Sequence, residues 1–178
     1  MKLYTKKGDR GETALFSGRR TRKSDPHINV VGDLDELSAA LGLAAIAFPA
    51  GAQDIRTIQH DLYAISALIS AEGKRPELVF SDAEARRLEV IIDDVSNTLP
   101  ELRDFIYPGE SEASARLHMA RVVARRAERG MAALNPQVPP AVSAYINRLS
   151  DLLFVWARRV DFDAGHASVP LAGPRGKA

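Results

Sequence analysis

Cysteine is absent from this sequence of 178 residues, so disulfide bonds, thiolate metal sites and thiol nucleophiles are excluded. There is also no run of 18 apolar residues and no early apolar segment, so neither a membrane span nor a signal peptide is predicted. We therefore expect a cytoplasmic protein that makes no membrane contact.

Signatures of several enzyme classes are missing as well. No Glu-x-x-His pair lies on a predicted helix, and the four histidines are scattered, so a carboxylate-bridged metal centre is not expected and no metal ligands are assigned. The Gly-x-Ser-x-Gly turn that exposes a catalytic serine is also absent. If the protein is an enzyme, one of its substrates should therefore supply the nucleophile.

What the sequence does contain is helical periodicity in a chain long enough for one domain. The first helix starts at Asp25 or at a capping pair of Asp33 and Glu36, and Ser81 opens the third helix in a capping box. Two longer helices are predicted over residues 111–134 and 140–162. We predict an all-α fold, a five-helix up-and-down bundle over residues 26–163, with an N-terminal loop (residues 1–25) and a flexible tail (residues 164–178).

The N-terminal loop concentrates positive charge. Residues 1–25 carry eight Lys or Arg against three Asp or Glu, whereas the remaining chain carries 16 against 20. Between residues 5 and 23, glycines and threonines are interleaved with these charges, a pattern typical of a polyphosphate-binding loop. A solvated basic arm, or a helical module that binds nucleic acid, is the alternative interpretation of the same composition.

Two predicted helices carry polar stripes that are candidates for binding. Arg121, Arg125 and Glu128 share one face of the fourth helix, which is an anion-binding face, a subunit contact or simply a solvated surface. Along the fifth helix, the helical spacing aligns Asn147, Asp151, Phe154 and Arg158. Before the fourth helix, the apolar stretch from Phe105 to Pro108 either presents Phe105 to a ligand or covers the bundle.

Three separated motifs resemble those of the PduO-type ATP:cob(I)alamin adenosyltransferases, in the family's order. They are residues 5–18 (TKKGDRGETALFSG) with 32–37 (GDLDEL), residues 121–129 (RVVARRAER) and residues 145–154 (YINRLSDLLF). The resemblance covers residues 3–162. It implies a homotrimer that binds ATP with Mg²⁺ and a corrinoid, cobalamin, where neighbouring subunits meet, and that forms adenosylcobalamin.

The resemblance also implies roles for individual residues. Asp35 and Arg121 correspond to an intersubunit pair, Arg125 would meet the triphosphate, and Phe105 would lie beneath the corrinoid. The resemblance implies that these four are the catalytic residues. Phe154 and Asp151 would complete the corrinoid site. The remaining implied contacts are with ATP, from Thr5, Lys6, Gly8, Asp9, Gly11, Thr13, Gly18, Lys23, Glu128 and Asn147.

The implied chemistry explains why ordinary catalytic motifs are missing. Co(I) is itself the nucleophile that attacks the ribose C5′ carbon of ATP, so the protein only has to align the substrates and stabilise the leaving triphosphate. The resemblance further implies a cobalamin reductase and an adenosylcobalamin-dependent enzyme as partners, and no nucleic acid. A carrier or regulatory protein that binds the same ligands is the nearest alternative.

Overall fold

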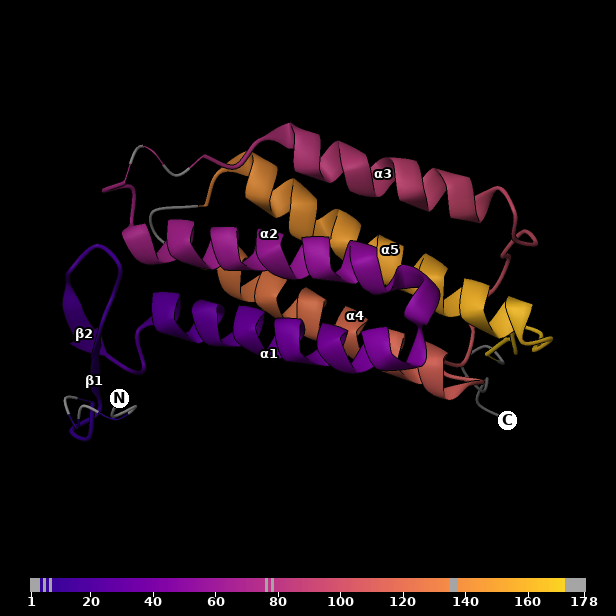
Figure 1. Ribbon diagram of the computed structural model, residues 1–178, viewed down its shortest axis with the longest axis horizontal. Helices are drawn as coiled ribbons and strands as arrows, with labels where there is room; N and C mark the ends of the chain where they lie inside the picture. The colour runs from indigo at the N-terminus through magenta and orange to yellow at the C-terminus, as the bar shows by residue number, and fades with distance from the viewer. Residues whose placement is uncertain are drawn as a thin grey trace, which may run out of the picture.

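The structure is a computed structural model that describes residues 4, 6, 8–75, 77, 79–134 and 138–171. It contains five α-helices: α1 (Pro26–Ala47), α2 (Ala52–Ala71), α3 (Asp82–Ser96), α4 (Glu112–Ala132) and α5 (Pro140–Asp163). They run along one long axis, and each runs opposite to the one before it (Figure 1). A 3₁₀ turn, η1 (Pro49–Gly51), joins α1 to α2. The prediction of a five-helix fold is confirmed.

Local sequence signals fix the helix starts. Asp25 is the N-cap of α1 and its side chain accepts a hydrogen bond from the backbone N–H of His27, so the earlier of the two predicted starts is correct. Ser81 and Glu84 form the predicted capping box of α3. Ser111 caps α4 in the same way with Ser114.

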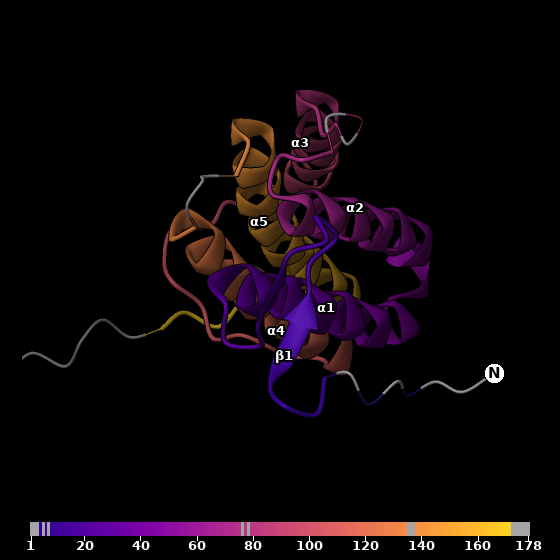
Figure 2. The ribbon, with the colours of Figure 1, turned by 90° about the vertical axis from the view of Figure 1, so that its left-hand side faces the viewer.

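The core lies along the centre of the bundle, where α1 packs between α2 and α4 while α5 packs between α4 and α3 (Figure 2). One polar cluster reaches from this core to the surface, with Asp61 and Tyr145 buried and Arg87 exposed. Asp61 on α2 accepts a hydrogen bond from the Tyr145 hydroxyl on α5 at 2.7 Å and pairs with Arg87 on α3. Burial and the neighbouring Asp61 carboxylate raise the pKa of Tyr145, so this hydroxyl stays protonated and ties three helices together.

The N-terminal segment contains a short antiparallel hairpin that the sequence did not predict, formed by β1 (Glu12–Ala14) and β2 (Arg20–Arg22). Its turn uses Gly18 at φ 84°, a conformation that favours glycine. The hairpin is docked on the bundle by buried Leu15 and by the Ser17 backbone N–H, which donates to the Ser70 carbonyl at 3.0 Å.

The chain after α5 folds back onto the loop that precedes α4. The Tyr107 N–H donates to the Val169 carbonyl at 2.9 Å, and the Leu171 N–H donates to the Phe105 carbonyl at 2.6 Å. Composition alone did not indicate this pairing. In the part of the chain that the structure describes, no helix has both the length and the apolar character needed to cross a membrane.

Candidate functional site

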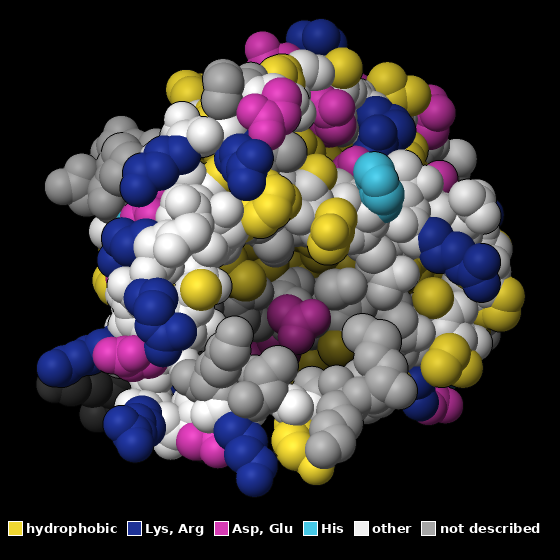
Figure 3. Space-filling model, turned by 60° about the vertical axis from the view of Figure 1, so that its left-hand side comes forward, with side chains coloured by type: hydrophobic (Ala, Val, Ile, Leu, Met, Phe, Trp, Pro, Cys, Tyr) yellow, Lys and Arg dark blue, Asp and Glu magenta, His cyan; other side chains and the backbone are white. Residues whose placement is uncertain are grey.

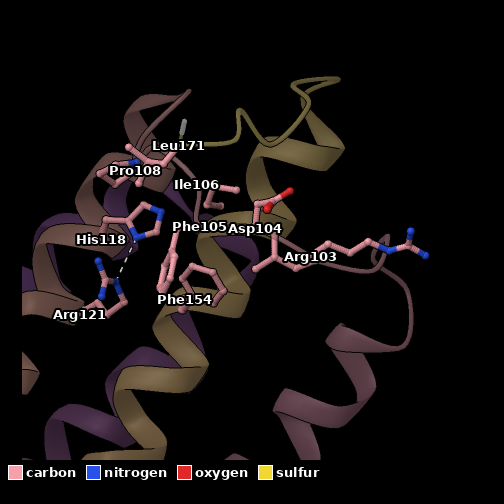
Figure 4. A pocket seen from close by; sticks show the side chains of 10 residues that line it. Arg103, Asp104, Phe105, Ile106, Pro108, His118, Arg121, Phe154 and Leu171 are labelled. Carbon is pink, nitrogen blue, oxygen red and sulfur yellow. Dashed lines mark hydrogen bonds between the residues drawn. The ribbon is translucent and has the colours of Figure 1, made fainter. Parts of the chain in front are cut away.

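A cavity of about 690 Å³ opens at the end of the bundle where α4 begins. The Phe105 loop, the C-terminal segment through Leu171, and α4 and α5 all contribute to its lining (Figure 4). Phe105 and Phe154, predicted from the sequence as corrinoid contacts, both line this cavity. The Phe105 side chain is 87% exposed, so in the single chain it presents an apolar ring to whatever enters.

One wall of the cavity holds a paired histidine and arginine from α4. The Arg121 Nε donates to the Nδ1 atom of His118 at 3.2 Å, and the His118 ring lies 6.0 Å from the Phe154 ring between centroids. Burial, followed by the nearby Arg121 charge, lowers the pKa of His118. Burial, followed by Arg125, lowers the pKa of Arg121. The wall is therefore a neutral imidazole beside a guanidinium.

The predicted stripe continues from this wall along α4 and α5. Arg121, Arg125 and Glu128 share one face of α4. Glu128 lies seven residues after Arg121, which is roughly 10 Å along the helix axis. Glu128 accepts a hydrogen bond from the Asn147 Nδ2 at 2.9 Å, so these two predicted ATP contacts meet across the helices. Asp151 is exposed on α5 between Asn147 and Phe154.

A hydrogen-bonded chain fixes the amide of Asn147. The Arg148 Nη1 donates to the Asn147 Oδ1 at 2.9 Å, while its Nε donates to Glu89 on α3 at 2.9 Å. The Asn147 oxygen is thus engaged on one side and its nitrogen faces Glu128 on the other. Three helices therefore hold this polar group in one orientation.

Most of the predicted ATP contacts lie in the N-terminal segment that contains the hairpin, just before the start of α1. Gly11 has φ 78° and Gly18 has φ 84°, whereas Lys6 adopts φ 59° without being glycine. A Cβ built on Gly8 would lie 3.5 Å from Lys23 Nζ, so these two residues are neighbours. Thr13 lies within β1, Asp9 is exposed, and Thr5 falls outside the described residues.

Acidic side chains hold this hairpin against the bundle. Glu72, in the left-handed conformation just after α2, accepts hydrogen bonds from the Ser17 hydroxyl at 2.8 Å and from the Arg19 Nη2 at 2.8 Å. Asp25 accepts from the Thr21 hydroxyl at 2.7 Å and from Arg19 at 3.0 Å. Hydrogen bonds from Thr21 lower the pKa of Asp25, and those from Arg19 lower the pKa of Glu72.

We call Glu72 and Asp25, the two acidic residues that hold the hairpin, the clamp. Another, smaller cavity of about 240 Å³ lies beside it, and Glu72 and His27 are among the residues that line this cavity. Figure 3 shows a hollow at this end of the molecule, with acidic atoms at its floor and both basic and acidic side chains around it. Side chains of both charges thus lie at the end of the molecule that carries the glycine-containing hairpin.

One chain does not bring all the predicted residues together. The hairpin lies at the start of α1 (Figure 1). The Phe105 cavity lies nearer the other end of α1, where Arg116 of α4 donates to the Leu43 carbonyl at 2.9 Å. The 22 residues of α1 span about 33 Å. Asp35 is exposed on α1, and no hydrogen bond or ion pair joins it to Arg121 within the described residues.

Sequence reasoning missed three residues of these sites: His118, Glu72 and Leu171. His118 precedes Arg121 by one helical turn, a spacing that could have suggested contact. Glu72 gave no such signal, because its partner Arg19 lies 53 residues away. Leu171 lines the Phe105 cavity only because the C-terminal segment folds back.

Comparison of the sequence with known proteins finds one family, the cobalamin adenosyltransferases. A family model described as cobalamin adenosyltransferase matches residues 3–160. Corrinoid adenosyltransferase PduO of Citrobacter freundii is 43% identical over 171 residues, covering 92% of this chain and 51% of that protein. The chain thus spans about half the length of this relative. The corrinoid adenosyltransferase of Bacillus subtilis is 37% identical over 95% of this chain and 91% of its own length.

Solved structures agree with the sequence relatives. A variant of the PduO-type ATP:corrinoid adenosyltransferase from Lactobacillus reuteri, complexed with cobalamin and ATP, superposes with a TM-score of 0.91. The two chains are 28% identical, and the match covers 97% of each. A second variant of that protein, complexed with ATP, gives a TM-score of 0.87 over 96% of this chain and all of the other.

Proposed function

Because the chain belongs to the cobalamin adenosyltransferase family, we propose that it transfers the 5′-deoxyadenosyl group of ATP to the cobalt of reduced cobalamin. The products are adenosylcobalamin and triphosphate. The observation that carries this proposal is the apolar cavity of Phe105 and Phe154, which adjoins Arg121 on the same helix face as Arg125. Such a surface suits a large apolar ring system beside a polyanion.

The reaction needs no nucleophile from the protein. Co(I) supplies both electrons of the new Co–C bond, and the C5′–O bond of ATP breaks with its electron pair leaving on triphosphate. Arg125, with Mg²⁺ carried by ATP, would stabilise that negative charge. Glu128 and the oriented Asn147 would contact the nucleotide, as would Lys6, Gly8, Asp9, Gly11, Thr13, Gly18 and Lys23, with Thr5 proposed from the sequence only.

The phenylalanines act by excluding other ligands. Apolar rings beneath the corrinoid would keep water and the cofactor's own base away from cobalt. Loss of the lower axial ligand makes Co(II) easier to reduce to Co(I). Phe105, exposed in the single chain, would become buried against the corrinoid, and Asp151 would lie beside the same substrate.

We propose that the active site forms between subunits of a homotrimer. The hairpin lies at the start of α1 and the cavity lies towards its other end, and α1 is about 33 Å long, which supports a hairpin that serves a neighbouring copy. Exposed Asp35 would pair with Arg121 of that copy. Exposed apolar side chains on the adjacent helices α1 and α4 support burial of this surface, namely Leu43, Ile46, Met119 and Val122.

The test is incubation of the protein with chemically reduced cob(I)alamin and MgATP. Loss of the Co(I) absorption, with formation of a light-sensitive alkylcobalamin over many turnovers, is expected. Tight binding of both ligands without turnover would instead indicate a carrier. We also propose two partners, a reductase that would supply Co(I) where no chemical reductant is present and an adenosylcobalamin-dependent enzyme that would take the product.

A further inference from the structure

A histidine in the proposed corrinoid cavity presents a chemical conflict. Neutral imidazole is a common metal ligand, through either ring nitrogen. His118 is buried in the cavity wall, yet the proposed reaction requires cobalt without a lower axial ligand. We propose that Arg121 holds His118 in the tautomer protonated on Nε2, so that no nitrogen lone pair of this ring is available to cobalt. This inference rests on the proposed function.

The hydrogen bond itself determines the tautomer. A guanidinium has only donors, so the Nδ1 atom that receives the Arg121 Nε–H at 3.2 Å must carry a lone pair and no proton. A neutral imidazole with an unprotonated Nδ1 carries its proton on Nε2. Both ring nitrogens are then occupied: Nδ1 by the bond from Arg121, and Nε2 by its own hydrogen.

The surroundings keep the ring neutral. Burial and the Arg121 charge lower the pKa of His118, and the Asp161 carboxylate opposes them with a smaller effect. A doubly protonated ring would also lose the bond from Arg121, because two donors would then face each other. Figure 4 shows Arg121 on one side of the His118 ring, which stands beside Phe105 and Phe154.

The arrangement leaves Arg121 able to act in a second contact. Among the residues that the structure describes, Arg121 makes its side-chain hydrogen bond through Nε, to His118, which leaves the two Nη groups for the proposed intersubunit pair with Asp35. Arg121 is therefore a positioning residue whose removal affects the state of the cavity as well as the trimer. A readout of cobalt coordination separates these two effects.

Electron paramagnetic resonance of bound cob(II)inamide with MgATP makes that separation. This corrinoid lacks an intrinsic base, so any splitting from an axial nitrogen must come from the protein. The wild-type spectrum should show no splitting from an axial nitrogen. The spectrum of Arg121→Met should show this splitting, and the double variant Arg121→Met/His118→Leu should lose it. When Arg121→Met is labelled with ¹⁵N-histidine, the three-line splitting that ¹⁴N gives should become a two-line splitting. Arg126→Met is the matched control, because Arg126 pairs with Asp33 and should leave cobalt unaffected.

Nitrogen NMR of the ligand-free protein reads the tautomer without corrinoid. The His118 resonances, assigned by their loss in His118→Gln, should show unprotonated Nδ1 and protonated Nε2 in wild type. The inference is overturned by a protonated Nδ1 in wild type, by histidine splitting in the wild-type spectrum, or by bound Arg121→Met without splitting. A wild-type protein that binds corrinoid and makes no adenosylcobalamin would contradict the proposed function instead, leaving the tautomer result intact.

Discussion

Phe105 gives the sharpest test of the cavity, because its exposure separates function from stability. A buried phenylalanine replaced by alanine costs about 3 to 5 kcal/mol of folding free energy. The Phe105 side chain is 87% exposed, so Phe105→Ala should leave the melting temperature nearly unchanged. If the ring becomes buried against corrinoid, its loss removes about 1.5 to 3 kcal/mol of binding. At 1.4 kcal/mol per tenfold, corrinoid affinity should fall about 10- to 150-fold.

The assay compares thermal unfolding, corrinoid binding and ATP binding in one variant. Tyr63→Ala is the matched control, because Tyr63 is a 75% exposed aromatic on α2 and does not line the Phe105 cavity. Adenosylation should survive better when Co(I) is supplied chemically than when the protein starts from Co(II) and a reductant. A large fall in melting temperature with unchanged corrinoid affinity would refute the reasoning, since Phe105 would then be a core residue.

Four further perturbations test other parts of the account. Arg125→Ala should lower kcat/KM by a factor of about 10² or more, and a variant with wild-type turnover would exclude a role on triphosphate. Asp35→Asn should weaken the trimer by about 3 to 5 kcal/mol if the pair with Arg121 is buried between subunits; sedimentation showing an unaltered trimer would make it a surface contact. Glu72→Gln should raise the KM for ATP more than it lowers kcat, because the clamp positions the hairpin rather than the reacting atoms. Finally, the lowered pKa of His118 means that the unfolded chain binds more protons between that pKa and about 6.5, so stability should fall as pH falls through this window. Chemical denaturation of His118→Gln should show a flatter pH dependence there.

Local signals in the sequence were sufficient for the helices. Apolar residues such as Ile55, Ile58 and Leu62 follow helical spacing and are buried, and the capping residues Asp25 and Ser81 mark the observed starts. Helical spacing also placed Arg121, Arg125 and Glu128 on one face, because three or four residues bring side chains together on any α-helix. These features depend on neighbours in the chain and need no tertiary information.

Features that depend on distant segments were not predictable in this way. The hairpin is stabilised by Glu72 and Ser70, which lie more than 50 residues from their partners. Likewise, the C-terminal segment pairs with the Phe105 loop across more than 60 residues, and its composition resembles an unpaired tail. The resemblance of the motifs supplied roles for residues such as Asp35. If the proposed intersubunit pair is correct, the partner of Asp35 belongs to another subunit, so a single chain cannot show the pair.

The most direct test of the proposed transfer follows the carbon and the phosphates of ATP together. The protein is given cob(I)alamin and MgATP labelled with ¹³C at C5′, and the products are examined by carbon and phosphorus NMR. We expect the labelled carbon to be bonded to cobalt and one intact triphosphate to be released for each adenosylcobalamin. Labelled carbon that stays bonded to oxygen, with ADP and phosphate as products, would contradict it.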